Sequence, residues 1–273
     1  GSIVIANPPS ISHQIAAQTT AEDTNLGGLA LTVSDQETDD GQLVLSFTES
    51  ANPGLIDTIN FTNNGGAVTA EIVPAPNATG DTEVTISVTD AAGGRTAATP
   101  FALTITSVND NPVAGADSGV GFITDEDTAF TTASGLLNDS DVDAGDTLSI
   151  TAVGATTVAG TSVSVNPDGT FTYDPNGQFE NLAPGASATD TFEYTLSDGN
   201  GGSATGTVEI TIEGVNDAAV AVDDSGDDFT TDEDTAFITA NVVANDTDVD
   251  GDPLSVVAGS LDLTGTQGLV QSN

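Results

Sequence analysis

The sequence predicts an all-β protein built from tandem β-sandwich domains, on the evidence of an internal repeat and of strand-like residue alternation. Three markers occur twice: TDEDTAF at 124–130 and 231–237, VND at 108–110 and 215–217, and DVD at 141–143 and 248–250. In each case the second copy begins 107 residues after the first (124 to 231, 108 to 215 and 141 to 248). A repeat of about one hundred residues indicates that each unit is a whole domain.

The expected strands are runs in which apolar and polar residues alternate. Clear runs lie at 83–89, 101–107, 162–166, 191–197 and 207–212. Clusters of turn-forming residues separate such runs: DAAGG (90–94), NPDG (166–169), DPNG (174–177) and DGNGG (198–202). Thr, Val, Ile and Ser dominate the runs, which favours strands over helices. About seven short strands in a unit of about 105 residues are typical of an immunoglobulin-like β-sandwich, and the units are expected to stack head to tail.

The repeat predicts three domains and a short leader. We expect residues 1–7 to be a tag or leader, because Gly1-Ser2 resembles residues left by cloning. The domains are expected at 8–111, at 112–217 and, as the first half of a third sandwich, at 218–273. Half a sandwich leaves one inner sheet face uncovered. The third domain is therefore expected either to be truncated or to be split by an inserted module.

The charge of the chain is extreme. It has 42 Asp and Glu residues against one basic residue, Arg95, which gives a net charge of −41 and a pI of about 4.1. Such a chain repels itself, so a cation is expected to supply positive charge. Ca²⁺ fits, because carboxylate and carbonyl oxygens are its ligands. Disorder is the alternative for an acidic chain, but 37% of the residues are apolar and they fall in alternating runs.

Composition also excludes several classes of function. Nucleic-acid binding needs Lys and Arg, which are almost absent. No stretch approaches the roughly 20 apolar residues that span a bilayer, so membrane insertion is not expected. There is no Cys, so neither disulfides nor thiolate metal sites are possible.

The acidic residues are expected to converge at the junctions between domains. In a sandwich, the turn after the first strand, the loop before the sixth strand and the domain exit lie at one end, and the next domain contributes the loops of its opposite end. The expected ligands at the first junction are Glu22, Asp81, Asn109, Asp110, Asp141, Asp143 and Asp198. Those at the second are Glu126, Asp190, Asn216, Asp217, Asp248 and Asp250, with Glu233 as the next repeat of Glu126. Ca²⁺ takes roughly six to eight oxygen ligands, so each junction is predicted to hold one ion or several.

These motifs resemble a known group of domains. SVNDNPVA (107–114) is similar to the DxNDN linker of cadherin repeats, and TDEDT, NDSDVD, NDTDVD and LSDGNGG resemble bacterial cadherin-like and VCBS-type repeats. Residues 182–217 resemble the VCBS-type pattern over their whole length, whereas the first domain departs from it with SDQETDD at 34–40. The resemblance implies Ca²⁺-bridged extender repeats of large secreted RTX-type adhesins on the bacterial cell surface. Their partners are neighbouring repeats of the same polypeptide, and other domains carry the adhesive target.

An enzyme is not expected. His13 is the only histidine and has no counterpart in the repeats, and the 4% aromatic content is low for a sugar cleft. Phe171, Tyr173, Phe192 and Tyr194 alternate along strands, which favours core packing. DTDVDG (246–251) matches the first half of an EF-hand loop, but Val257 stands where a bidentate Glu is required.

Two other functions stay open at the level of sequence. A ligand-binding or homophilic adhesion module would need an exposed apolar or aromatic patch, for which the expected loop at 50–66 is a candidate. The other alternative is an accessory region of a secreted hydrolase, although the density of junction-type acidic motifs favours a long array.

Overall fold

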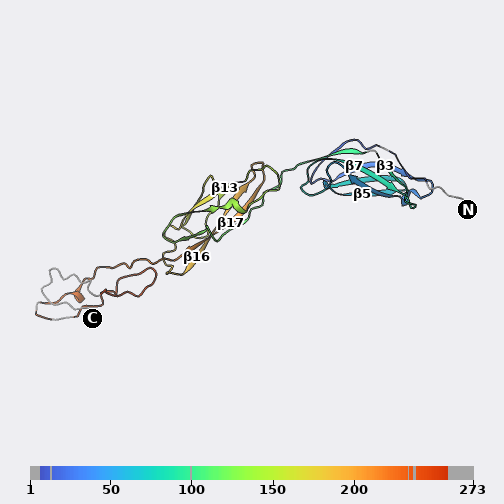
Figure 1. Ribbon diagram of the computed structural model, residues 1–273. Coiled ribbons are helices and arrows are strands. Elements are labelled where there is room, and N and C mark those ends of the chain that lie inside the picture. Colours follow the sequence, from blue (N-terminus) through green and yellow to red (C-terminus); the bar gives the residue numbers. More distant parts are fainter. Residues whose placement is uncertain (1–6, 13, 99, 233, 236–237, 258–273) are drawn as a thin grey trace. The chain divides into compact units, whose positions relative to one another are not determined.

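The computed structural model describes residues 7–12, 14–98, 100–232, 234–235 and 238–257 (Figure 1). Gly1, Ser2, His13 and Glu233 lie outside these residues. Regular structure in the described part consists of strands and three short 3₁₀ helices, η1 (Asp40–Gln42), η2 (Gly135–Asn138) and η3 (Asp227–Phe229). The predicted all-β class is confirmed. None of the helices in this part of the chain is long and apolar enough to cross a membrane.

The chain divides into two compact units. The first contains residues 1–110 and 142–145, and the second contains residues 111–141 and 146–273. Each unit has its own hydrophobic core.

The first unit is a sandwich of two sheets (Figure 1). One sheet has the order β1 (Ser10–Ser12), β3 (Leu26–Ser34), β6 (Ala67–Pro74), β5 (Ile56–Asn64). The other has the order β2 (Gln18–Ala21), β9 (Phe101–Thr106), β7 (Gly80–Thr89), β4 (Val44–Glu49), and β8 (Arg95–Ala97) also pairs with β7. The first strand of this second sheet, β2, runs parallel to the last strand of the unit, β9, and the remaining pairs are antiparallel. Because β2 and β9 run in the same direction, the turn after β2 lies at the end of the unit where the chain leaves it after β9.

Residue alternation explains the core of the first unit. Val84, Ile86 and Val88 on β7 are buried, with exposed fractions of at most 1%, because side chains two residues apart point to the same face of a strand. The segment expected as a loop at 50–66 is instead mostly strand β5, so that expectation is wrong. Its residues Ile56 and Ile59 are both buried in the core although they are three residues apart, because the pairing of this edge strand shifts register between Ile56 and Thr58.

The second unit repeats this architecture. One sheet has the order β10 (Ala116–Asp117), β17 (Ser203–Glu213), β16 (Ser187–Ser197), β13 (Ser149–Val153), and β11 (Ile123–Asp125) runs parallel to β17. The other has the order β12 (Phe130–Ser134), β15 (Thr170–Asp174), β14 (Ser162–Val165). Strands β16 and β17 form a long hairpin paired from Ser187 and Glu213 to Ser197 and Ser203 (Figure 1). Each of the five runs predicted from alternation overlaps a strand.

An aromatic cluster fills the core of the second unit. Phe171, Tyr173, Phe192 and Tyr194 are each at most 2% exposed. The ring of Phe171 lies 5.1 Å from that of Phe192 and 5.6 Å from that of Tyr194, measured between centroids. The prediction that these rings serve packing is confirmed.

The segment after residue 217 begins as the second unit does. Val220 and Thr247 form an isolated antiparallel bridge, as Val113 and Ser140 do one repeat earlier. The N–H of Val222 donates to Asp246 Oδ1 at 2.8 Å, and the N–H of Gly115 donates to Asp139 Oδ1 at the same distance. The sequence repeat is therefore also a repeat of backbone contacts.

Candidate metal centre

In the first unit, a buried glutamate and the chain exit form a hydrogen-bonded frame. Glu22 lies in the turn between β2 and β3, is 4% exposed, and accepts a hydrogen bond at Oε1 from the N–H of Val108 at 2.8 Å. The N–H of Asp110 donates to Asp143 Oδ2 at 2.7 Å. Carboxylate oxygens of Glu22, Asp110 and Asp143 all lie within 4.8 Å of one another. We call Glu22, Val108, Asp110 and Asp143 the first exit frame.

A polar pocket adjoins the first exit frame. Its volume is about 290 Å³, and it is lined by Glu22, Asn77, Thr79, Ser107, Val142, Asp143 and Ala144. The loop at 75–79 between β6 and β7 thus faces the frame with an amide and a hydroxyl.

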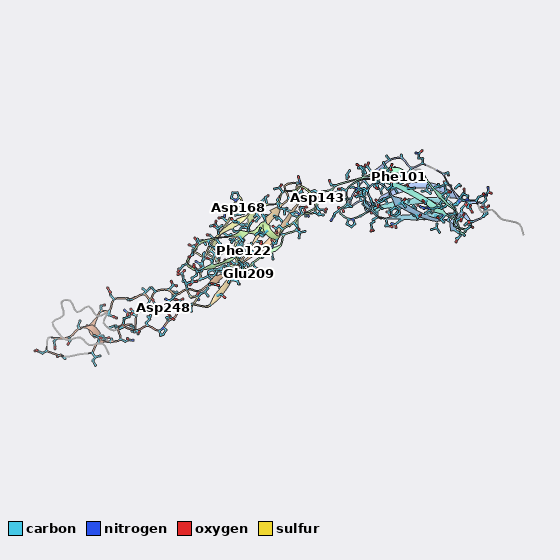
Figure 2. All side chains as sticks on the ribbon, in the orientation of Figure 1. Phe101, Phe122, Asp143, Asp168, Glu209 and Asp248 are labelled. Atoms are coloured by element: carbon cyan, nitrogen blue, oxygen red, sulfur yellow. The ribbon has the colours of Figure 1, made fainter. Side chains whose placement is uncertain are left out.

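The loop that carries the first DVD motif also gathers its own carboxylates. Oxygens of Asp141, Asp143 and Asp146 lie within 4.8 Å of one another, in the loop between η2 and β13. Figure 2 labels Asp143 in this loop. Asp146 Oδ1 accepts a hydrogen bond from Asn200 Nδ2 at 2.7 Å. Asp146 was not expected as a site residue.

The second unit contains the same frame. Glu126 lies in the turn after β11, is 1% exposed, and accepts at Oε1 from the N–H of Val215 at 2.7 Å. The N–H of Asp217 donates to Asp250 Oδ2 at 2.8 Å. We call Glu126, Val215, Asp217 and Asp250 the second exit frame. Both frames join the turn glutamate to the exit backbone and the exit backbone to the second Asp of a DVD motif.

Further carboxylates surround the second exit frame. Oxygens of Asp127, Glu180 and Asp217 lie within 4.8 Å of one another. Glu180 comes from the loop between β15 and β16. Sequence reasoning missed Glu180 because no repeated motif marks its loop. It also missed Asp125 and Asp127, although both lie beside Glu126 in the repeated TDEDT motif.

Several buried oxygens near the second exit frame have no hydrogen-bond partner among the described residues. They are Asp125 Oδ1, Glu126 Oε2, Asp217 Oδ2 and Asp250 Oδ1. A buried polar atom without a partner costs about 1–3 kcal/mol, and more when it is charged. Four such atoms lie near one exit, and a cation is the kind of group that could satisfy them.

The electrostatics of this region agree with that reading. Burial raises the pKa of the Asp217 carboxyl, and the charges of Asp127 and Asp250 raise it further. Burial also raises the pKa of Glu180, with Asp217 and Asp127 as the largest charged contributors. Both shifts mean that these groups resist ionisation together, which a bound cation would relieve.

The DVD loop near the second exit frame is held by its first aspartate. The N–H groups of Asp250 and Asp252 donate to Asp248 Oδ1 at 3.0 and 3.3 Å. Asp248 thereby orients Asp250 toward the exit backbone, and it lies in a loop (Figure 2).

Other expected ligands shape the backbone. Asp198, 1% exposed, accepts the N–H groups of Asn200, Gly201 and Gly202 at 2.8–3.0 Å and so closes the turn between β16 and β17. Asn109 and Asn216 each donate from Nδ2 to the carbonyl of the next residue, at 2.9 and 2.6 Å. These contacts hold both exits in the same conformation.

Asp81 and Asp190 are not in the acidic groups that converge within the described residues. Asp81 lies on β7 and accepts a hydrogen bond from Thr104 Oγ1 at 2.6 Å.

Asp190 is fully buried, and both of its carboxylate oxygens accept hydrogen bonds. The donors are Thr157 N–H and Oγ1, Val158 N–H, Thr161 Oγ1, Tyr173 Oη and Thr191 N–H. Burial opposes ionisation of Asp190, but the hydrogen bonds outweigh it and lower the pKa. These contacts give Asp190 a structural role in the core.

The comparisons with known proteins concern parts of the chain. Comparison with curated proteins finds no match. Similar solved structures include extracellular cadherin domains 1–5 of protocadherin gamma B2 (19% identity, 78% of this chain and 42% of that one, TM-score 0.45). Others are the human desmocollin-1 ectodomain (14%, 80% and 43%, 0.47) and an endo-fucoidan hydrolase of glycoside hydrolase family 107 (19%, 78% and 31%, 0.30). The chain spans less than half of the length of each.

The family matches cover the second unit and the segment after it. Residues 109–214 match the bacterial cadherin-like domain, and residues 216–273 match the bacterial Ig domain. The resemblance to bacterial cadherin-like repeats that the motifs predict is therefore confirmed for residues 109–214, the domain that precedes the second exit.

Proposed function

We propose that this chain consists of Ca²⁺-rigidified extender repeats of a bacterial surface adhesin. Bacterial cadherin-like and Ig domains are typical of extracellular adhesin-like repeats. In this proposal the repeats lie outside the cell, their partners are neighbouring repeats, and other domains carry the ligand for surface attachment or biofilm formation. The observation that carries the proposal is the exit frame, which occurs twice. Near the second frame, four buried carboxylate oxygens have no hydrogen-bond partner within the described part of the chain.

The donor chemistry favours Ca²⁺ over other metals. The convergent groups are carboxylates throughout, and the chain has no Cys and one His. Zinc and other transition metals prefer nitrogen and sulfur ligands. Mg²⁺ demands near-octahedral geometry, whereas Ca²⁺ accepts more ligands in irregular arrangements. The residues proposed to hold Ca²⁺ are the carboxylates of the two exit frames with Asp127, Glu180, Asp141, Asp146 and Asp248.

The frame links metal binding to the stiffness of the exit. At the second exit, one backbone hydrogen bond joins Asp217 to the DVD loop of the following segment. Without a cation, the charges of Asp127 and Asp250 oppose that of Asp217, so the exit is expected to flex. A bound ion would bridge the same groups and fix them. Extracellular Ca²⁺ modules have dissociation constants of about 10⁻⁴–10⁻³ M, so rigidity would follow export from the cell.

Thermal unfolding and small-angle X-ray scattering test this proposal. In excess chelator we expect a lower melting temperature and a broader, shorter distance distribution than in millimolar Ca²⁺, with Mg²⁺ giving little recovery. Asp250→Asn should reduce the response to Ca²⁺. Glu209→Gln, an exposed substitution on β17 (Figure 2), should leave it unchanged. If neither the melting temperature nor the maximum dimension responds to Ca²⁺ in the unsubstituted protein, the proposal fails.

A further inference from the structure

The two exit frames share a backbone geometry but differ in the charge around them. The turn sequence is DEDT at 125–128 and AEDT at 21–24, so Ala21 stands where the second unit has Asp125. The loop between β15 and β16 contributes Glu180 in the second unit. Its counterpart at 75–79 in the first unit, APNAT, contains no carboxylate.

The neutral substitutes in the first unit face its frame. Asn77 and Thr79 line the same pocket as Glu22 and Asp143. They offer oxygen atoms to a cation but no charge. In its turn and in the loop at 75–79, the first exit frame thus has two fewer carboxylates than the second. The two DVD loops do not change this difference, because each adds one further carboxylate, Asp146 in the first and Asp252 in the second.

The additional carboxylates of the second unit lie where a cation is needed. Glu180 converges with Asp127 and Asp217 within 4.8 Å. Glu126, 1% exposed, accepts a hydrogen bond from the exit backbone at one oxygen, and its other oxygen, Oε2, has no hydrogen-bond partner among the described residues. The same holds for the buried Asp125 Oδ1. The affinity of an oxygen-ligand Ca²⁺ site rises with the number of charged ligands.

We propose that the two exits bind Ca²⁺ unequally: the second exit fills first and holds at least one more ion, through Glu180, than the first. This inference rests on the proposed function. Its consequence is a two-step response to Ca²⁺, in which the exit at Asp217 stiffens at a lower concentration than the exit at Asp110. Between the two concentrations, one exit is fixed while the other still bends.

Backbone amides provide a matched pair of probes. The N–H groups of Val215 and Asp217 donate into the second frame, and those of Val108 and Asp110 donate into the first. Titration of the ¹⁵N-labelled chain with CaCl₂, followed by amide chemical shifts, reports each exit separately. We expect the second pair of amides to reach half-saturation at a concentration about tenfold lower than the first pair.

Two substitutions make the test reciprocal. Glu180→Gln should remove the difference between the two pairs and lower the number of bound Ca²⁺ ions, measured by equilibrium dialysis, by at least one. Thr79→Glu, at an exposed position, should move the half-saturation of Val108 and Asp110 to lower Ca²⁺. Glu209→Gln is the control and should change neither.

The outcomes separate the two proposals. Simultaneous saturation of both pairs, or earlier saturation of Val108 and Asp110, would overturn the unequal filling while leaving Ca²⁺ binding intact. An unchanged stoichiometry in Glu180→Gln would overturn the assignment of the extra ion. If neither pair responds to millimolar Ca²⁺, the proposed function itself fails.

Discussion

Asp117→Asn is expected to stabilise the second unit at neutral pH. Asp117 lies on β10, is 4% exposed, and has its Oδ2 buried without a hydrogen-bond partner among the described residues. The pKa of its carboxyl is raised to about 6: burial is the main cause, the charge of Asp139 adds to the rise, and hydrogen bonds from Tyr194 and Asn138 partly oppose it. Asparagine keeps the shape of the side chain and removes the buried charge.

The sign of the pH dependence follows from the raised pKa. The folded protein holds the proton more tightly than the unfolded chain, so the favourable contribution is complete below about pH 4. It is lost as the pH rises through about 6. The difference between the ordinary pKa of 3.8 and about 6 corresponds to about 2–3 kcal/mol of unfolding free energy. Relative to Asp117→Asn, the unsubstituted protein should therefore lose about that much stability between pH 4 and pH 8.

Tyrosine fluorescence isolates the relevant unit. The chain has two tyrosines and no tryptophan, and both Tyr173 and Tyr194 are buried in the second unit. Urea unfolding followed by this signal, in chelator from pH 4 to pH 8, gives the free-energy difference between the two proteins. Asp168→Asn is a control of opposite sign, since hydrogen bonds from Thr170 lower the pKa of the exposed Asp168. A difference between unsubstituted protein and Asp117→Asn that does not change with pH would refute the reasoning.

Two further substitutions test the packing of the same unit by the same fluorescence assay. Asp190→Asn should destabilise it by about 2–4 kcal/mol, because an amide cannot accept from all the donors around Asp190; a loss below that of Tyr173→Phe, which removes one of those donors, would contradict this role. Gly206→Ala should cost about 1–3 kcal/mol, because the added Cβ would overlap the ring of Tyr194. Gly154→Ala, whose Cβ would meet Glu193 O at 3.4 Å, is the matched control and should cost less.

The fold could be predicted from sequence because its signal is periodic. Alternation places strands and the 107-residue shift aligns the exits, and the structure keeps both features: the predicted runs lie on strands, and the exit contacts of Asp110 and Asp217 are repeated. Such patterns follow from local backbone geometry, so they can be recognised in the sequence without information on tertiary contacts.

The position of Asp190 could have been read from the same periodicity. Asp190, Phe192, Tyr194 and Leu196 are two residues apart and all buried on β16. The first unit offers an exposed carboxylate, Asp81, at a nearby but not equivalent position. A shift of one residue along a strand moves a side chain to the other face. Sequence reasoning treated Asp81 and Asp190 as equivalent, but Asp190 points into the core and Asp81 points to the surface.

Glu180 could not have been found in this way. It lies in the loop between residues 174 and 187, whereas the corresponding loop of the first unit lies between residues 74 and 80. Loops of different length have no shared register, so the repeat gives no counterpart for Glu180. Its role depends on which loop residue the fold brings beside Asp217, which is a tertiary contact.

Two kinds of carboxylate in this chain differ in their hydrogen-bond partners, and the difference matters for the proposed function. Asp190 and Asp198 are deeply buried, and protein donors bind their oxygens, so they need no external charge and belong to the folding of the sandwich. Glu126 and Asp217 have one oxygen each without a partner in the described structure, at the point where the chain leaves the domain. Because protein donors already satisfy the first kind, the proposed Ca²⁺ would act on the exits and leave the sandwich cores formed in its absence. The proposed extender needs this separation, since its domains must persist while the joints between them respond to the ion.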